Sequence, residues 1–279
     1  YGVCAFFPTL ATDSVENLQK QISEIKKAMQ LQENSLEPLA KILGVHLEAC
    51  FLNPVKKGIH DENLLLKPTI ENFKLLEDDI IKIVTLAPEL DERNLLCAYL
   101  KEKGIRVSAG HCMGADLSHV DQVTHLYNAM GAFSHRTQST VVSALCNDNI
   151  YTEIIADGIH VQKDVLNITF RTKPLNKIIL ISDALPITHS DKDSMDFCSK
   201  KVFLQNGKAV DSNGTIAGST AFVYDIIKML VNQGMLDLRT ACAMASKNLT
   251  YIQDLNSQLY WDSSCNIQAM NINGSLVTF

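Results

Sequence analysis

The sequence predicts an α/β protein whose core is a parallel β-sheet covered on both faces by helices. Short apolar runs alternate with segments in which apolar residues recur at helical spacing, and this order repeats as far as residue 184. The runs carry few polar residues, which is typical of strands buried on both faces. Seven such strands are consistent with most of an eight-stranded β/α barrel, although the pattern alone also permits an open doubly wound sheet.

The predicted elements follow one another in a regular order. Strands are expected at residues 2–9, 44–51, 80–88, 105–111, 122–127, 151–158 and 177–184. Helices are expected from a capping box at Asp13 and Glu16 as far as Met29, after Pro68, and over 91–103, 141–145 and 164–172. No glycine-rich nucleotide-binding motif follows a strand, which weakens the nucleotide-binding alternatives.

The pattern changes after Asp183. Asn206-Gly207 lies inside an alternating run and predicts a β-hairpin, and two helices are expected over 219–232 and 236–247. Residues 258–279 alternate in polarity, contain Asn273-Gly274, and predict antiparallel strands. We therefore expect a barrel over residues 1–247 and strands of a small β-domain over 248–279.

The bulk properties favour an ordinary globular enzyme or binding protein. The 279 residues carry a net charge of −6, which argues against nucleic acid or an anionic membrane as the main partner. No apolar run is long enough to cross a bilayer. The eight cysteines are scattered without metal-type or disulfide-type spacing, so we expect reduced thiols and a cytoplasmic location.

Polar residues stand at the carboxyl ends of four predicted strands. Alternation places Glu48, His111, His125 and Asp183 at these ends, each after apolar residues of the same strand face, except that His46 precedes Glu48. In a barrel these ends meet at one mouth. A carboxylate and two imidazoles suit Zn²⁺ or Fe²⁺, and Asp183 could accept and return a proton there. Each residue alone also fits a structural role, such as a turn or a hydrogen-bonded core group.

Several motifs, in their order along the chain, resemble the N-acetylglucosamine-6-phosphate deacetylase family of the amidohydrolase superfamily. They are GVHLEACFLNPVKKGIHD (44–61), GH (110–111), THLYNAM (124–130), HR (135–136), IIADGIHV (154–161), LISDA (180–184) and TIAGST (215–220). The resemblance covers nearly the whole chain. It implies a metal-dependent hydrolase barrel of the TIM type with part of a small β-sandwich domain, and hydrolysis of N-acetylglucosamine 6-phosphate to glucosamine 6-phosphate and acetate.

The resemblance also implies a role for each matching residue. Glu48, His111 and His125 correspond to the ligands of one divalent metal ion, Zn or Fe, Asp183 to the general acid/base, and His60 to the group that stabilises the oxyanion. Residues expected to contact the sugar phosphate are Asn128, Ala129, Arg136, His160, Ile216, Ala217 and Gly218. The family implies a homodimer, and neither nucleic acid nor membrane is expected as a partner.

This sequence departs from the family pattern in four places, one of which is a shortened hairpin between the last helices and the tail. HLEAC replaces the usual HLEGP, which puts Cys50 near the expected metal; the connection from His111 to His125 is short; and the chain starts at what would be the second barrel strand. We therefore expect the first strand to be absent. Two alternatives follow: a deacetylase of a related N-acyl sugar phosphate, or a non-catalytic homologue that binds a sugar phosphate.

Overall fold

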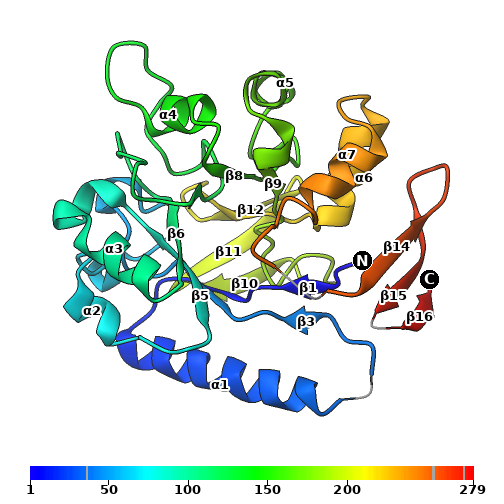
Figure 1. Cartoon of the computed structure of the whole chain (residues 1–279), viewed down its shortest axis with the longest axis horizontal. Helices are drawn as coiled ribbons and strands as arrows, with labels where there is room; N and C mark the ends of the chain where they lie inside the picture. Colours follow the sequence, from blue (N-terminus) through cyan, green and yellow to red (C-terminus); the bar gives the residue numbers. More distant parts are fainter. Residues whose placement is uncertain (36, 253–254, 273) are drawn as a thin grey trace.

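The centre of the computed structural model, which describes residues 1–35, 37–252, 255–272 and 274–279, is a seven-stranded parallel sheet (Figure 1). Its order is β2-β4-β5-β6-β7-β8-β9, and every adjacent pair is parallel. The strands are β2 (Thr9–Leu10), β4 (Val45–Leu47), β5 (Ile81–Leu86), β6 (Arg106–Ala109), β7 (Gln122–Val123), β8 (Tyr151–Ile154) and β9 (Ile178–Leu180). The predicted parallel sheet is confirmed, with its strands in their order along the chain.

One further parallel contact extends the sheet beyond β9. Ala184 and Ser219 form an isolated parallel bridge, in which the Ser219 N–H donates to the Asp183 carbonyl over 2.8 Å. Within the residues that the structure describes, no ladder joins this edge to β2. The absence of a first barrel strand stays a prediction.

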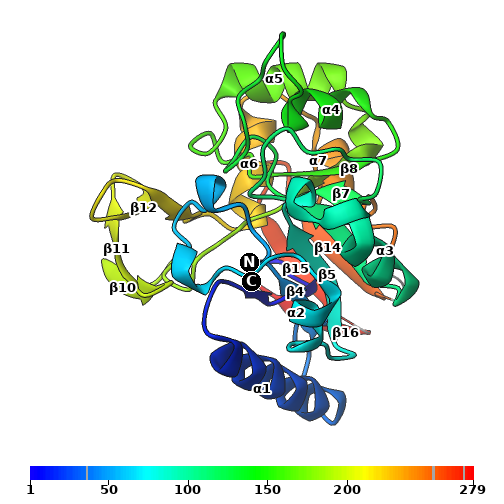
Figure 2. The same cartoon turned by 90° about the vertical axis from the view of Figure 1, so that its left-hand side faces the viewer.

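Helices surround the sheet, as the two views show (Figures 1 and 2). The α-helices are α1 (Val15–Glu33), α2 (Ile70–Lys74), α3 (Leu95–Glu102), α4 (Thr140–Cys146), α5 (Lys163–Thr172), α6 (Val223–Asn232) and α7 (Leu238–Met244). Short 3₁₀ turns are η1 (Pro54–Lys56), η2 (Glu62–Leu64), η3 (Pro88–Leu90), η4 (Glu92–Asn94) and η5 (Leu175–Lys177). No helix lies between β6 and β7 in the part of the chain described, in keeping with the short connection seen in the sequence.

Three predicted helix starts were wrong: the cap of α1 by one residue, and the starts of α3 and α6 by four residues each, since α6 begins at Val223 and not at 219. Helix α1 is capped by Ser14, whose hydroxyl accepts from the Asn17 N–H over 3.2 Å, and not by a capping box that starts at Asp13. Helix α3 begins at Leu95 and not at Asp91. Two left-handed residues precede it, and the Asp91 carboxylate instead caps it from a distance by accepting from the Leu96 N–H over 3.0 Å.

The first predicted strand is split into two. Residues 5 and 6 form β1 (Ala5–Phe6), which pairs in parallel with β3 (Lys41–Ile42) outside the main sheet, whereas β2 enters the main sheet. Pro8 lies between β1 and β2 and has no N–H to donate to a ladder, so a single continuous strand is disfavoured there.

A four-stranded antiparallel sheet is inserted between β9 and α6. It consists of β10 (Ser194–Phe197), β11 (Lys200–Gln205), β12 (Lys208–Asp211) and β13 (Ile216–Gly218), and it projects away from the helices (Figure 2). The predicted Asn206-Gly207 hairpin is confirmed, with φ of 52° and 75° at the two residues. Buried side chains of this sheet pack against Ile59, so the sheet supports the segment that carries His60.

The end of the chain forms a three-stranded antiparallel sheet, as its alternating pattern predicts. Its strands are β14 (Ser257–Trp261), β15 (Ile267–Ile272) and β16 (Ser275–Thr278). Asn273 of the predicted Asn273-Gly274 turn lies outside the described residues. The two ends of the chain lie near each other, because the Cys4 thiol lies 3.6 Å from the Met270 sulfur (Figure 2). The domain division at residue 247 stays a prediction.

Two bulk expectations can be compared with the structure. None of the described helices has both the length and the apolar character that a membrane span requires. All eight cysteines are free thiols.

A glycine at the entry to β4 gives a test of the packing. Gly44 has a φ of +130°, and a Cβ atom there would lie 2.5 Å from Lys82 Cγ and 2.6 Å from the Ile80 carbonyl oxygen. We expect Gly44→Ala to lower the free energy of unfolding by about 2–4 kcal/mol, because it adds both backbone strain and a clash with backbone. Urea denaturation measures this change.

Gly104→Ala is the matched control. Gly104 also has a positive φ, of +71°, but no atom lies within 4 Å of the Cβ position. Only the left-handed backbone penalty applies, so a loss of about 1 kcal/mol is expected. Equal losses in the two variants would contradict the packing described for Gly44.

Candidate active site

The polar strand-end residues of the sequence lie along one edge of the parallel sheet. Glu48 follows β4 directly, His111 and His125 follow β6 and β7, and Asp183 follows β9. Since the strands are parallel, their carboxyl ends share one edge, which is where open sheets and barrels of this class bind ligands.

Three of these side chains form one cluster. Glu48 Oε1 lies 2.9 Å from His125 Nε2 and 3.2 Å from His111 Nε2. One potential ligand atom from each residue lies within 4.8 Å of the others, and all three side chains are buried. It is the only such group of three among the residues that the structure describes.

The ring orientations fit a cation held between these atoms. His111 Nδ1 donates to the Lys56 carbonyl over 2.8 Å, so a neutral His111 ring turns its Nε2 lone pair toward Glu48. Two electron-rich atoms facing each other are stabilised by a positive ion between them. Ligand atoms about 2.0–2.1 Å from a tetrahedral ion lie roughly 3.3 Å apart, close to the observed His111–Glu48 separation. The donor set therefore fits a divalent metal ion.

Left-handed backbone turns place three of the strand-end residues. His111, His125 and Asp183 have φ of 47°, 32° and 48°, a region that non-glycine residues seldom occupy. The alternation argument for His111 and His125 was therefore incomplete. Ser108 and Thr124 hydrogen-bond to each other, so their side chains lie on the same face of the sheet. Strand alternation alone would direct His111 and His125 to the opposite face. The histidines reach Glu48 because the chain turns after each strand.

A buried chain of hydrogen bonds lies beside the cluster. His46 Nε2 lies 2.7 Å from Thr85 Oγ1, which lies 2.7 Å from Thr124 Oγ1, and His46 Nδ1 lies 3.2 Å from Thr9 Oγ1. Both ring nitrogens of His46 are thus occupied, and His46 acts as a structural core residue two positions before Glu48. The chain ties β2, β4, β5 and β7 together directly next to the cluster.

Burial and mutual charge shift the pKa values of these groups in opposite directions. Burial alone would lower the pKa of His125, but the charge and hydrogen bond of Glu48 raise it to about 9. Burial likewise opposes ionisation of Glu48, yet His125 and His111 hold its pKa well below the usual range. Removal from water raises the pKa of Asp183. The charge of His125 lowers this pKa, whereas the charge of Glu48 raises it further. A carboxyl group with a raised pKa is suited to taking up and returning a proton.

His60 lies beside the cluster on the loop between η1 and η2. Its ring meets the His111 ring edge-on at a centroid distance of 4.8 Å, and it is buried. Burial, with the nearby charge of His111, lowers the pKa of His60 to about 3, which keeps the ring neutral.

The structure brings only some of the expected substrate residues to this site. A Cβ atom on Gly218 would lie 3.0 Å from the Asp183 carbonyl oxygen, so this end of β13 lies next to Asp183, and the charge of His160 contributes to lowering the pKa of Asp183. Asn128 and Ala129 directly follow the His125 turn, and Ala129 has a φ of 51°. Ile216 and Ala217 are partly buried in β13.

Arg136 is a different case. It is exposed, and within the described residues no contact links its guanidinium group to the cluster. Its role in binding phosphate stays a prediction.

Two residues of the site were missed from the sequence. Asp157 accepts from the ring of His160 over 2.7 Å and from two backbone N–H groups of the same turn, which fixes the imidazole. Thr12 contacts the ring of His60. The spacing Asp-x-x-His was a usable signal for the first, whereas Thr12 is 48 residues from His60 and gives no local signal.

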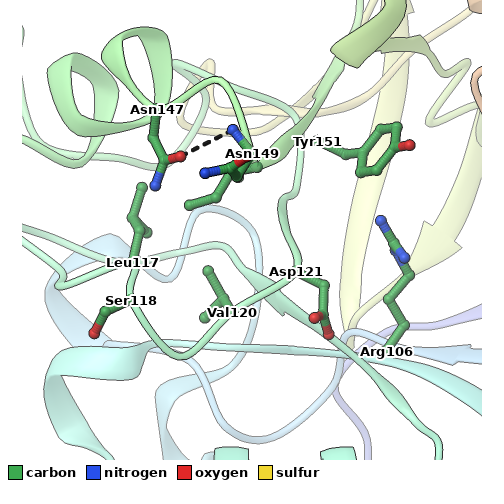
Figure 3. A pocket seen from close by; sticks show the side chains of 9 residues that line it. Arg106, Leu117, Ser118, Val120, Asp121, Asn147, Asn149 and Tyr151 are labelled. Carbon is green, nitrogen blue, oxygen red and sulfur yellow. Dashed lines mark hydrogen bonds between the residues drawn. The ribbon is translucent and has the colours of Figure 1, made fainter.

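A cavity of about 330 Å³ lies at the opposite end of the strands (Figure 3). Its lining includes Arg106 and Tyr151, the first residues of β6 and β8, and Asp121, which precedes β7. The Asn149 N–H donates to the Asn147 side chain on its wall over 3.0 Å. This cavity is therefore separated from Glu48 by the length of the strands and is not the candidate active site.

Comparisons with known proteins agree with the motifs. No protein-family profile matches the chain. The N-acetylglucosamine-6-phosphate deacetylase of Bacillus subtilis is 33% identical over 248 residues, which cover 85% of this chain and 60% of that protein. The N-acetylgalactosamine-6-phosphate deacetylase of a Shewanella species is 28% identical, over 88% of this chain and 63% of that protein. The chain thus spans less than two thirds of either relative.

A solved structure shows the same architecture. The crystal structure of N-acetylglucosamine-6-phosphate deacetylase from Pasteurella multocida superposes with a TM-score of 0.86 and is 27% identical, covering 99% of this chain and 76% of that one. The fold is therefore of the α/β, TIM-barrel-like kind.

Metal binding by the cluster can be tested at Glu48. We expect Glu48→Gln to weaken Zn²⁺ binding by at least about 100-fold, since even partners outside the ligand set contribute 10–100-fold. Competition with a chelator measures the affinity. In the wild type, Zn²⁺ at 100 times its Kd should also raise the free energy of unfolding by about 2.7 kcal/mol.

Glu153→Gln is the matched control. Glu153 is buried and accepts from Gln122 over 2.7 Å, and burial raises its pKa to about 8, so the glutamine closely copies its neutral form. Zinc affinity close to wild type is expected. An unchanged affinity in Glu48→Gln would show that zinc binds elsewhere.

Proposed function

The chain belongs to the N-acetylglucosamine-6-phosphate deacetylase family, and we propose that it hydrolyses N-acetylglucosamine 6-phosphate to glucosamine 6-phosphate and acetate. The observation that carries this proposal is the cluster of Glu48, His111 and His125 at the carboxyl edge of the sheet, with Asp183 close by. The reaction breaks the C–N bond of the acetamido group by adding water to its carbonyl carbon.

Glu48, His111 and His125 are proposed to hold one divalent ion, Zn²⁺ or Fe²⁺. When bound, such an ion supplies Lewis-acid activation of water and of the amide carbonyl. His111 is held for this role by its Nδ1 bond to the Lys56 carbonyl, which leaves Nε2 as the ligating atom.

Asp183 is proposed as the proton carrier. Its carboxylate accepts a proton from the attacking water, and it then gives that proton to the nitrogen as the C–N bond breaks. Its raised pKa and its closeness to the charges of His125 and Glu48 support this role. The bridge from Ala184 to Ser219 holds the backbone next to Asp183 against β13.

His60 is proposed to donate a hydrogen bond to the carbonyl oxygen as negative charge develops on it. A neutral imidazole in a buried position donates without first losing water, which is what makes such donors effective. The packing of His60 against His111 places it next to the proposed metal ligands.

The sugar phosphate is proposed to lie between the His125 turn and β13. Asn128, Ala129 and His160 would contact it from one side, and Ile216, Ala217 and Gly218 from the other. Arg136 would bind the phosphate, since a guanidinium matches that group. This last assignment rests on the motif.

A second substrate has specific support. A Shewanella relative is named an N-acetylgalactosamine-6-phosphate deacetylase and is 28% identical over most of this chain. Rates on N-acetylglucosamine 6-phosphate and N-acetylgalactosamine 6-phosphate, measured side by side, distinguish the two. A cytoplasmic homodimer, with a barrel over 1–247 and a small β-domain over 248–279, completes the proposal and rests on the family resemblance.

Replacement of Asp183 tests the mechanism. We expect Asp183→Asn to reduce kcat by about 10²–10⁴-fold on N-acetylglucosamine 6-phosphate with Zn²⁺ or Fe²⁺ added, because the amide cannot carry the proton. Acetate release measures the rate, and zinc content verifies that the cluster still binds metal. Wild-type turnover in this variant would remove Asp183 from the mechanism.

Asp121→Asn is the control for this experiment. Asp121 is a carboxylate at the opposite end of the strands, where it accepts from the Val107 N–H over 2.9 Å and pairs with Lys101 over 3.2 Å. The variant should keep the wild-type rate. A wild-type protein that lacks metal and activity but still binds glucosamine 6-phosphate would instead indicate a non-catalytic homologue.

A further inference from the structure

Thr12 holds the ring of His60 through a single ring nitrogen. Thr12 Oγ1 lies 2.6 Å from His60 Nδ1, and the Thr12 backbone nitrogen lies 3.4 Å from the same atom with hydrogen-bond geometry. The Thr12 hydroxyl also contacts the carbonyl oxygen of Ala49, the residue after Glu48. Thr12 and His60 are both buried, so these contacts are not exchanged with bulk water.

The chemistry of the contacts indicates which ring nitrogen carries the proton. A backbone N–H can only donate, so its bond to Nδ1 requires a lone pair on Nδ1. The Ala49 carbonyl can only accept, so the Thr12 hydroxyl donates to it. With the ring proton on Nε2, the hydroxyl proton is shared between Ala49 and Nδ1, and each of the three contacts joins a donor to an acceptor. With the ring proton on Nδ1, the hydroxyl would accept from Nδ1, but the Thr12 backbone N–H would then face another N–H.

We propose that Thr12 is a positioning residue that fixes His60 as the Nε2–H tautomer and turns Nε2 toward the substrate. This inference rests on the proposed role of His60 as a donor to the developing oxyanion. Only a protonated Nε2 can fill that role once Nδ1 is occupied, because a neutral imidazole has one N–H.

The position of Thr12 explains how the ring is linked to the metal cluster. Thr12 follows β2, the edge strand of the main sheet, and its hydroxyl contacts the residue directly after Glu48. One side chain therefore fixes the oxyanion donor relative to a proposed metal ligand. The ring of His60 also makes an edge-on contact with the ring of His111.

The test combines a spectroscopic and a kinetic measurement on the zinc-loaded protein. Imidazole ¹⁵N shifts separate protonated from unprotonated ring nitrogens, and the His60 signals are those lost in His60→Gln. We expect Nε2 protonated and Nδ1 unprotonated in the wild type. Thr12→Val, which keeps the shape and removes the hydroxyl, should shift His60 toward a mixture of tautomers and lower kcat about 10–100-fold with KM changed less than about twofold.

Two further variants complete the design. Thr12→Ser restores the hydroxyl and should recover most of the lost kcat and the wild-type ¹⁵N pattern. Thr9→Val is the control, because it removes a threonine hydroxyl that also contacts a histidine. The Thr9 hydroxyl lies 3.2 Å from Nδ1 of the core residue His46. The Thr9→Val variant should leave the His60 signals unmoved and the rate within about twofold of wild type.

The outcomes separate this inference from the proposed function. A wild-type protein with the proton on Nδ1 of His60, or a Thr12→Val variant with an unchanged tautomer, would overturn the inference even if deacetylation is observed. An inactive wild type with the Nε2–H tautomer would refute the proposed function and leave the positioning by Thr12 in place. If Thr12→Val does not fold, the wild-type ¹⁵N measurement still decides the tautomer.

Discussion

The candidate site is organised around one buried carboxylate that contacts two imidazoles. Glu48 is 5% exposed, and one of its oxygens faces both His111 and His125. An ionised carboxyl group in such a place is strongly unfavourable unless positive charge compensates it. The raised pKa of His125 is in keeping with compensation by a protonated imidazole, and the proposed metal ion would supply the positive charge through the same atoms.

The parallel sheet places these ionisable side chains at one end of its strands. The carboxyl ends of β4, β6, β7 and β9 supply the cluster and Asp183. At the amino ends, the Arg106 guanidinium lies 5.0 Å from the Tyr151 ring and 4.1 Å from the Tyr251 ring, and its Nε donates to Gln122. One terminal nitrogen of Arg106 is buried without a hydrogen-bond partner among the described residues, so the polar groups at this end satisfy one another only in part.

The fold could be predicted from apolar periodicity, since β4, β5 and β9 are mainly buried apolar residues and the remaining parallel strands each contribute buried apolar positions. The residues at which helices and strands begin and end could not be predicted from this periodicity. Pro8 divides the first strand, and the Asp91 side chain caps α3 from four residues before its start, which are effects of single side chains that a periodic pattern does not contain. For the site, Glu48 was placed correctly by alternation. His111 and His125 approach Glu48 through left-handed turns, which their residue types do not predict. Thr12 contacts His60 only because β2 pairs with β4 in the sheet.

We infer above all that Glu48, His111 and His125 hold one metal ion. X-ray absorption at the zinc edge of the zinc-loaded protein reports the atoms bound to the ion. We expect two imidazole nitrogens and carboxylate oxygen at about 2.0–2.2 Å, with no sulfur. A sulfur shell at about 2.3 Å would place a thiol such as Cys50 on the ion, and a shell without imidazole would show that the metal lies outside this cluster; either result would refute the proposed metal site.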